Sequence, residues 1–213
     1  MTINPQTSAE DFLPAQRTLD TMRNAARSCR GCDLYKNATQ TVFGEGPKHA
    51  RLLFVGEQPG DREDREGRPF VGPAGRLLDR AIEEADIPRK VVYVTNAVKH
   101  FKWIQRGKRR MHQKPLIRQV ISCKPWLRAE VESVRPKLVV CLGATAAQSM
   151  LGKVVRIGVE RGRFLDNEFA GTIFVTIHPS AILRQRDQAE REKEYLHFLA
   201  DIKSVRHHLD KLS

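Results

Sequence analysis

Four short motifs, separated along the chain, carry the residues best suited to chemistry. Glu57 offers a carboxylate, Asn96 a carboxamide and His178 an imidazole, while Phe70 offers an aromatic ring. A carboxylate and an imidazole can hold or move protons, a carboxamide donates and accepts hydrogen bonds, and an aromatic ring can stack on a planar ligand. The motifs are Gly56–Gly60, Gly67–Gly75, Thr95–Lys99 and His178–Ser180. They can act jointly only if the fold brings them together.

Four cysteines form a second set of candidate residues: Cys29, Cys32, Cys123 and Cys141. Two residues separate Cys29 from Cys32, a spacing that occurs in zinc knuckles and in redox pairs, whereas the other two could be ordinary buried thiols. No histidine is spaced for a mixed zinc site, so four thiolates together predict either zinc or a 4Fe–4S cluster. The spacing does not separate these two metals, and unligated core cysteines are the third possibility.

The sequence is strongly basic. It has 37 Lys and Arg against 25 Asp and Glu, a formal net charge of +12. The most biased segment, Lys99–Arg118, holds eight Lys and Arg residues and no acid. This surplus predicts a polyanionic partner, either nucleic acid or an anionic membrane surface. No apolar run is long enough to span a bilayer and no secretion signal opens the chain, so we expect a cytoplasmic protein without a membrane segment.

An acidic segment, Asp61–Glu66, follows the first motif and contains four carboxylates. Clustered carboxylates can bind a divalent metal ion. Arg62 and Arg65 interleave with them, however, which favours a solvated loop, and we predict no second metal there. We expect Asp61 and Asp64 to lie at the mouth of a pocket.

Alternating apolar runs and helical patterns predict an α/β fold. Strands covered on both faces are nearly continuously apolar, and such runs occupy residues 51–57, 91–98, 137–143 and 172–178. Helical patterns occupy residues 75–85, 115–134, 145–151 and 189–209, after a short helix that begins near residue 16. We therefore predict a three-layer α/β/α domain with a central, mostly parallel four-stranded sheet. Residues 1–14 are predicted to be a flexible tail and 15–213 a single domain.

The predicted sheet explains how the separated motifs could meet. In such sheets, ligands bind beyond the carboxyl ends of the strands. Those ends carry Glu57–Gly60, Asn96, Gly143 and His178–Ser180. We expect these polar residues to converge on one rim.

The motifs, in this order and together with the paired cysteines, resemble the iron–sulfur branch of the uracil-DNA glycosylase superfamily, close to its family four. The resemblance runs from Cys29 to about Arg184. Within that branch, Gly107–His112 (Gly-Lys-Arg-Arg-Met-His) looks like the basic loop of the UdgX type, with Met111 where that type has isoleucine. Gln58 is similar to the UdgX type as well, since other members tend to have alanine.

The resemblance implies a cofactor, a substrate and a set of contacts. It implies a structural 4Fe–4S cluster on Cys29, Cys32, Cys123 and Cys141. The implied partner is uracil-containing DNA, single-stranded or flipped from a duplex, bound by a monomer that associates with the nucleoid if the source is bacterial. The implied uracil-binding residues are Gln58, Asp61, Phe70, Asn96 and His178. The implied DNA-binding residues are Lys99, Lys108, Arg109, Arg110, Ser180 and Arg184.

The resemblance also implies a mechanism. The protein would excise uracil from DNA, with His178 donating a hydrogen bond to the uracil O2 atom as negative charge develops on the base. His112 would then attack C1′ of the sugar, oriented by Glu57, and leave a covalent histidine–C1′ link after a single turnover.

Each of these residues also has a simpler interpretation. Phe70 could be a core residue, Asn96 a strand-end cap and His178 a partner for a buried backbone group, while His112 could belong to a solvated basic loop. Two alternative functions follow. One is a conventional glycosylase that turns over, and the other is a non-catalytic module that binds uracil or single-stranded DNA.

Overall fold

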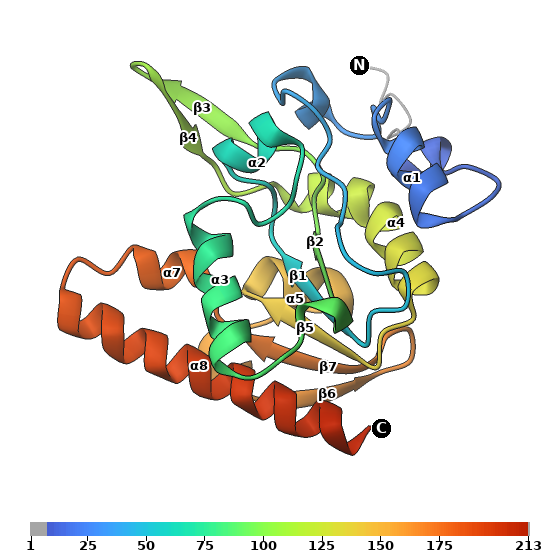
Figure 1. The fold of residues 1–213 in the computed structure, drawn as a ribbon. Coiled ribbons are helices and arrows are strands. Elements are labelled where there is room, and N and C mark those ends of the chain that lie inside the picture. Colours follow the sequence, from blue (N-terminus) through green and yellow to red (C-terminus); the bar gives the residue numbers. More distant parts are fainter. Residues whose placement is uncertain (1–7, 213) are drawn as a thin grey trace.

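A computed structural model describes residues 8–212 of the chain and contains a five-stranded sheet in the order β2-β1-β5-β7-β6 (Figure 1). Four strands run parallel, and β6 pairs antiparallel with β7 at one edge. The strands are β1 (Leu52–Gly56), β2 (Val92–Asn96), β5 (Leu138–Leu142), β6 (Phe164–Asn167) and β7 (Gly171–Thr176). The predicted α/β class is therefore confirmed, with five strands in place of the predicted four.

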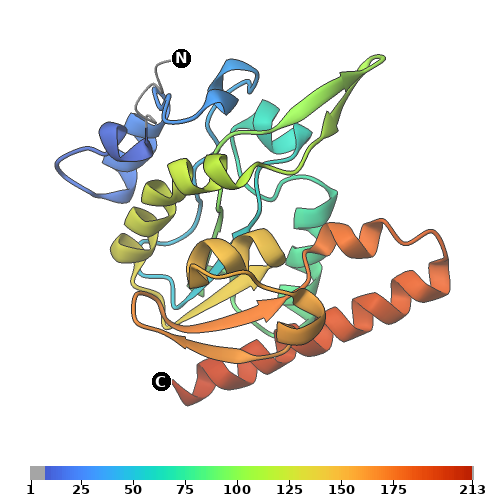
Figure 2. The ribbon, with the colours of Figure 1, turned by 180° about the vertical axis from the view of Figure 1, so that it is seen from behind.

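Helices cover both faces of the sheet, which Figures 1 and 2 show from opposite sides. The longer helices are α1 (Leu19–Ala26), α3 (Pro73–Glu84), α4 (Ile117–Val134), α5 (Ala144–Leu151) and α8 (Gln188–Lys211). The shorter ones are α2 (Asp61–Glu66), α6 (Ile157–Glu160) and α7 (Pro179–Leu183), with the 3₁₀ turns η1 (Ala9–Phe12), η2 (Asp33–Lys36) and η3 (Arg89–Val91). The helices predicted from the sequence lie within a few residues of observed ones.

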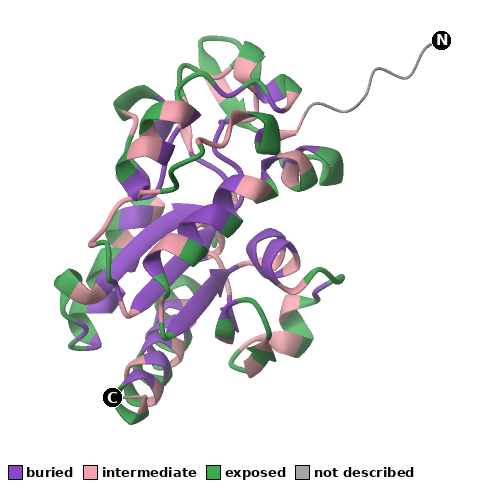
Figure 3. Ribbon diagram, turned by 90° about the vertical axis from the view of Figure 1, so that its right-hand side faces the viewer, coloured by how far each residue is buried: buried purple, intermediate pink, exposed green. Residues whose placement is uncertain are grey.

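The two faces of the sheet form two separate hydrophobic cores. In β1, Leu53 and Val55 pack in the core beneath α1, α4 and α5, whereas Leu52 and Phe54 pack in the core beneath α3 and α8. Because successive side chains of a strand point to opposite faces, a fully apolar strand serves both cores. Figure 3 shows the buried strands between helices whose outer faces are exposed.

A two-stranded hairpin projects from the domain beside α2 (Figure 1). It pairs β3 (Trp103–Arg106) with β4 (Arg109–His112), and Trp103 lies opposite His112. The hairpin carries the basic motif, for which the sequence suggested only a loop.

The beginning of the described chain is held more firmly than predicted. Ser8 caps η1, and Ala9 is only 1% exposed within the core that also contains residues of α4. The predicted flexible tail is therefore wrong for η1, while residues 1–7 lie outside the described part. Within residues 8–212, no helix is both long and apolar enough to cross a membrane.

Candidate active site

A cavity of about 810 Å³ opens at the carboxyl ends of the parallel strands. Its volume is typical of a site for a small molecule or a single nucleotide. Side chains from all the predicted motifs line it, including Glu57, Phe70, Asn96, His112 and His178. The strand ends thus bring together residues that lie more than a hundred positions apart in the sequence.

Asn96 and Phe70 meet over a glycine. Gly56, the last residue of β1, lies opposite Asn96 in the parallel register. A Cβ atom added at Gly56 would lie 2.3 Å from Asn96 Oδ1 and 2.8 Å from Phe70 Cζ. Phe70 adopts a left-handed backbone conformation with φ 56°. Its side chain is buried at 9% exposure and also lines the cavity. Gly56 therefore gives both side chains the room they need.

The ring of His178 is held in one orientation by the start of α7. Its Nδ1 atom accepts a hydrogen bond from the backbone N–H of Ser180 at 3.1 Å. Because Nδ1 accepts, the proton of the neutral ring is on Nε2, which is left as a donor. Burial, together with the charge of Arg184 and His112, lowers the pKa of His178 to about 4. His178 is consequently a neutral hydrogen-bond donor at neutral pH.

Glu57 and His112 approach each other in the cavity. Their Oε1 and Nε2 atoms are 3.5 Å apart, and the side chains are 23% and 52% exposed. The second carboxylate oxygen of Glu57 accepts a hydrogen bond from the Thr145 hydroxyl, which was not among the predicted residues. Partial burial lowers the pKa of His112 below its ordinary value, while the charge of Glu57 opposes this shift. A neutral imidazole therefore stands beside an oriented carboxylate.

Basic and polar residues occupy the mouth of the cavity. Arg184 is exposed and donates to the Ser180 hydroxyl at 2.9 Å, and both residues line the cavity. Lys108 and Arg109 are exposed at the tip of the hairpin. These four residues are accessible to a polyanion.

Gln58 lines the cavity as predicted for a uracil-binding residue, while its side-chain amide is hydrogen-bonded within the protein. Its side-chain nitrogen donates to the backbone oxygens of Lys102 and Gln113 at 3.2 and 3.0 Å, and its oxygen accepts from the Lys102 N–H. The amide therefore joins both strands at the base of the hairpin. These hydrogen bonds of Gln58 could not be predicted, because the sequence pattern did not reveal the hairpin.

The predicted DNA contact by Lys99 is wrong. Its side chain is buried, and its Nζ atom donates to Glu130, to the Thr95 hydroxyl and to the backbone oxygen of Asn96. Glu130 is fully buried and also accepts from Tyr93. Lys99 supports the end of β2 from within and cannot reach a phosphate.

The acidic segment is a helix and not the predicted solvated loop. Asp64 of α2 is fully buried, and its carboxylate accepts from the backbone and the hydroxyl of Thr39. Glu63, which the sequence did not single out, accepts from the backbone N–H groups of Gly60 and Gly72 and so joins the first two motifs.

Comparisons with known proteins agree with this arrangement of motifs. The sequence pattern of the Uracil DNA glycosylase superfamily matches residues 43–203, which include the whole cavity wall described above. The chain belongs to this superfamily. The resemblance found in its motifs is confirmed at that level.

Several curated proteins of the superfamily are similar to the chain along most of its length. The Type-4 uracil-DNA glycosylase of Thermotoga maritima is 36% identical over 177 residues, which cover 83% of this chain and 88% of that protein. Type-4 uracil-DNA glycosylases of Saccharolobus solfataricus and Archaeoglobus fulgidus are 36% and 34% identical, covering 78% and 83% of this chain and 77% and 88% of those proteins.

Of the four cysteines of this glycosylase-family chain, Cys29, Cys123 and Cys141 belong to one hydrophobic core and Cys32 packs against it. Burial raises the pKa of the Cys123 thiol to about 12, and the charges of Cys32 and Cys29 contribute to that rise. The sulfur of Cys123 accepts from the Lys99 N–H, and that of Cys29 from the Trp126 indole, each at 3.2 Å. Cys141 lies within β5, and its pKa is raised by burial alone. The four predicted ligands therefore share one region of the fold.

Proposed function

We propose that this protein excises uracil from DNA and then bonds C1′ of the resulting sugar to His112. The observation that carries the proposal is the position of His112, whose imidazole lies 3.5 Å from Glu57 in the cavity that also contains Asn96, Phe70 and His178. A solvated basic loop would give its histidine neither a carboxylate neighbour nor a place in the cavity wall. The superfamily match supports the glycosylase part of the proposal.

The base would be recognised by groups that suit uracil. The carboxamide of Asn96 can pair with the alternating donor and acceptor atoms of the uracil edge, and the ring of Phe70 can stack on its face. The Nε2–H group of His178 would donate to O2. As the C1′–N1 bond breaks, its electron pair goes to uracil, and a fixed donor lowers the energy of the anion that forms.

His112 would complete the reaction in place of water. The unprotonated ring nitrogen forms a bond to C1′, which has lost the uracil N1 atom, and the proton on the other ring nitrogen passes to Glu57. Thr145 holds Glu57 in position for this transfer through its hydroxyl. The product is a neutral alkylated imidazole. Because His112 is consumed in forming this bond, the protein acts once.

The proposed DNA contacts lie around the cavity mouth and on the hairpin tip. Lys108 and Arg109 would bind backbone phosphates at the tip, and Ser180 and Arg184 would bind them beside the bound uracil. A single-stranded or flipped nucleotide is required, because a stacked base cannot enter a cavity of this kind. We propose that a monomer suffices, since these groups all belong to one chain.

We also propose that a 4Fe–4S cluster is held by Cys29, Cys32, Cys123 and Cys141. Their proximity and the hydrogen bonds to two of the sulfurs support this assignment. Cys141 lies within β5, in the same hydrophobic core as Cys29 and Cys123. A brown protein whose iron content falls in Cys32→Ser would agree with the assignment, and a colourless zinc protein would contradict it.

Incubation with a single-stranded oligonucleotide that contains one uracil tests the proposed function. The account predicts a protein–DNA band that survives heat and SDS on a denaturing gel, and no such band with a thymine oligonucleotide. His112→Ala should form no band and still bind the uracil oligonucleotide. Free abasic DNA released over many turnovers would favour conventional excision, which the similarity to Type-4 enzymes suggests as the second candidate.

A further inference from the structure

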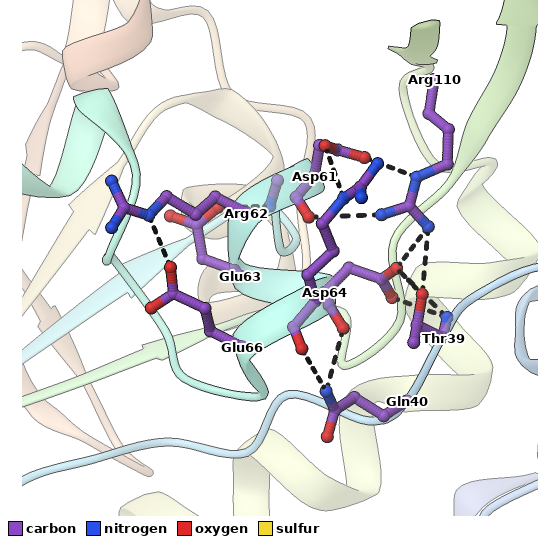
Figure 4. Close-up of polar contacts among 10 residues, drawn as sticks. Thr39, Gln40, Asp61, Arg62, Glu63, Asp64, Glu66 and Arg110 are labelled. Carbon is purple, nitrogen blue, oxygen red and sulfur yellow. Dashed lines mark hydrogen bonds and ion pairs between the residues drawn. The ribbon is translucent and has the colours of Figure 1, made fainter. Parts of the chain in front are cut away.

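Arg110, two residues before His112, contacts α2 and also Thr39, which precedes β1 in the chain (Figure 4). Its Nε atom donates to the carboxylate of Asp61, and its Nη1 atom donates to Asp64 at 2.7 Å and to the Thr39 hydroxyl at 3.1 Å. Its Nη2 atom donates to the Asp61 backbone oxygen at 3.3 Å. All three guanidinium nitrogens therefore bind a partner outside the hairpin.

The side chain of Arg110 is also enclosed by aromatic rings. Its guanidinium carbon is 5.5 Å from the ring centre of Phe101 and 5.4 Å from that of Trp103, distances at which a cation is attracted to an aromatic face. Only 13% of the side chain is exposed. The predicted DNA contact by Arg110 is thus not supported, because its donors face protein carboxylates.

The hairpin geometry links Arg110 to His112. Residues two apart in a strand point to the same face, so both side chains leave β4 on the side that faces the domain. Met111, between them, points to the other face and is 41% exposed. Any shift of β4 on α2 that displaced Arg110 would therefore displace His112 as well.

The helix beneath the hairpin is itself held in place. Asp64 is anchored to Thr39, and Glu63 bonds to the backbone N–H groups of Gly60 and Gly72. The helix begins four residues after Glu57, the partner of His112. Gln58 secures the base of the hairpin from the same segment. A single short segment thus holds Glu57 and also holds the strand that presents His112 to it.

We propose that Arg110 is a positioning residue for His112, acting through its ion pairs with Asp61 and Asp64. By fixing β4 on α2 it keeps the imidazole within reach of C1′ and beside Glu57, so that His112 reacts before water does. This inference rests on the proposed function, because it concerns the step in which the sugar is captured.

The test measures how the excised sugar is divided between two products under single-turnover conditions, with protein in excess over a uracil oligonucleotide. Released uracil gives total excision, and a denaturing gel gives the fraction captured as adduct. Arg110→Ala should still release uracil, while the captured fraction falls at least about tenfold and free abasic DNA rises, since a displacement of about 1 Å can cost a hundredfold in rate. A purely structural role would reduce both products together.

Arg106→Ala is the matched control. It removes the same charge from the same hairpin, at an exposed position on the opposite face from Arg110. The captured fraction should stay at the wild-type value. If the captured fraction fell equally in Arg106→Ala, the lost charge alone would explain the effect, and the proposal would be overturned.

Arg110→Lys provides a second, milder variant if the alanine variant does not fold. Lysine keeps the charge but has one nitrogen in place of three, so it cannot bind Asp61, Asp64 and Thr39 in the same geometry. Its captured fraction should lie between those of the wild type and Arg110→Ala. Wild-type capture in Arg110→Lys and in any folded Arg110→Ala would overturn the inference, whereas absence of adduct in the wild type would instead overturn the proposed function.

Discussion

His112 and His178 occupy one cavity, but their neighbours give them different tasks. The Ser180 backbone fixes the proton of His178 on the nitrogen that is free to donate, and among the described residues His112 has no comparable backbone donor. His112 instead has Glu57 as its nearest charged partner. These neighbours agree with the proposed roles, in which His178 stabilises the leaving group and His112 attacks carbon.

The pH below which the captured fraction declines should reflect the pKa of His112. Only the neutral ring has a lone pair, and burial lowers the pKa of His112 below the ordinary histidine value of about 6.5. The captured fraction should stay constant as pH falls through about 6.5 and should decline only at lower pH. Single-turnover capture measured across a pH series checks this. A decline that begins above the ordinary value would show that the pKa of His112 is raised, contrary to the structure.

Gly56 should be required for uracil release. A Cβ atom there would lie within 3 Å of both Asn96 and Phe70, so Gly56→Ala would displace the two groups proposed to recognise the base. We expect roughly a hundredfold slower uracil release in single-turnover assays. Gly158→Ala is the matched control, because nothing lies within 4 Å of the added carbon, and it should behave like the wild type. Equal rates in the two variants would contradict the assigned site.

At the scale of elements, the sequence predicts the parallel strands well because they are buried on both faces and therefore almost entirely apolar. It does not reveal β6, which is short, half-buried and at the sheet edge, nor the hairpin, whose strands are rich in arginine. Arg110 looks solvated in the sequence because its carboxylate partners lie more than forty residues away. The residues of the cavity could be predicted from motifs, but the groups that hold them could not.

The ion pair beneath β2 should contribute strongly to stability. Lys99 and Glu130 are 1% and 0% exposed, so removing the lysine leaves a buried carboxylate without its counter-charge. Lys99→Met should lower the free energy of unfolding by about 3–5 kcal/mol in urea titrations. Arg128→Met, which breaks an exposed pair on the same helix, should cost about 1 kcal/mol or less. Comparable losses in the two variants would contradict this account of Lys99.

At the scale of the whole molecule, the net charge of +12 should make DNA binding sensitive to salt. Each phosphate neutralised releases counterions, so the logarithm of affinity falls linearly with the logarithm of salt concentration. Lys108→Ala, at the exposed hairpin tip, should reduce that slope by about one. Lys203→Ala on α8, which lies at the other end of the molecule from the hairpin (Figure 1), should leave the slope unchanged. Equal slopes for Lys108→Ala and the wild type would exclude the hairpin tip from the DNA contact.

The identity of the residue bonded to DNA tests the central claim most directly. After reaction with a uracil oligonucleotide, nuclease and protease digestion followed by tandem mass spectrometry would locate the sugar remnant on the protein. The account predicts a deoxyribose-derived mass on the peptide containing His112, with fragment ions that place it on the imidazole. A remnant on another side chain, or an unmodified His112 peptide alongside free abasic DNA, would contradict it.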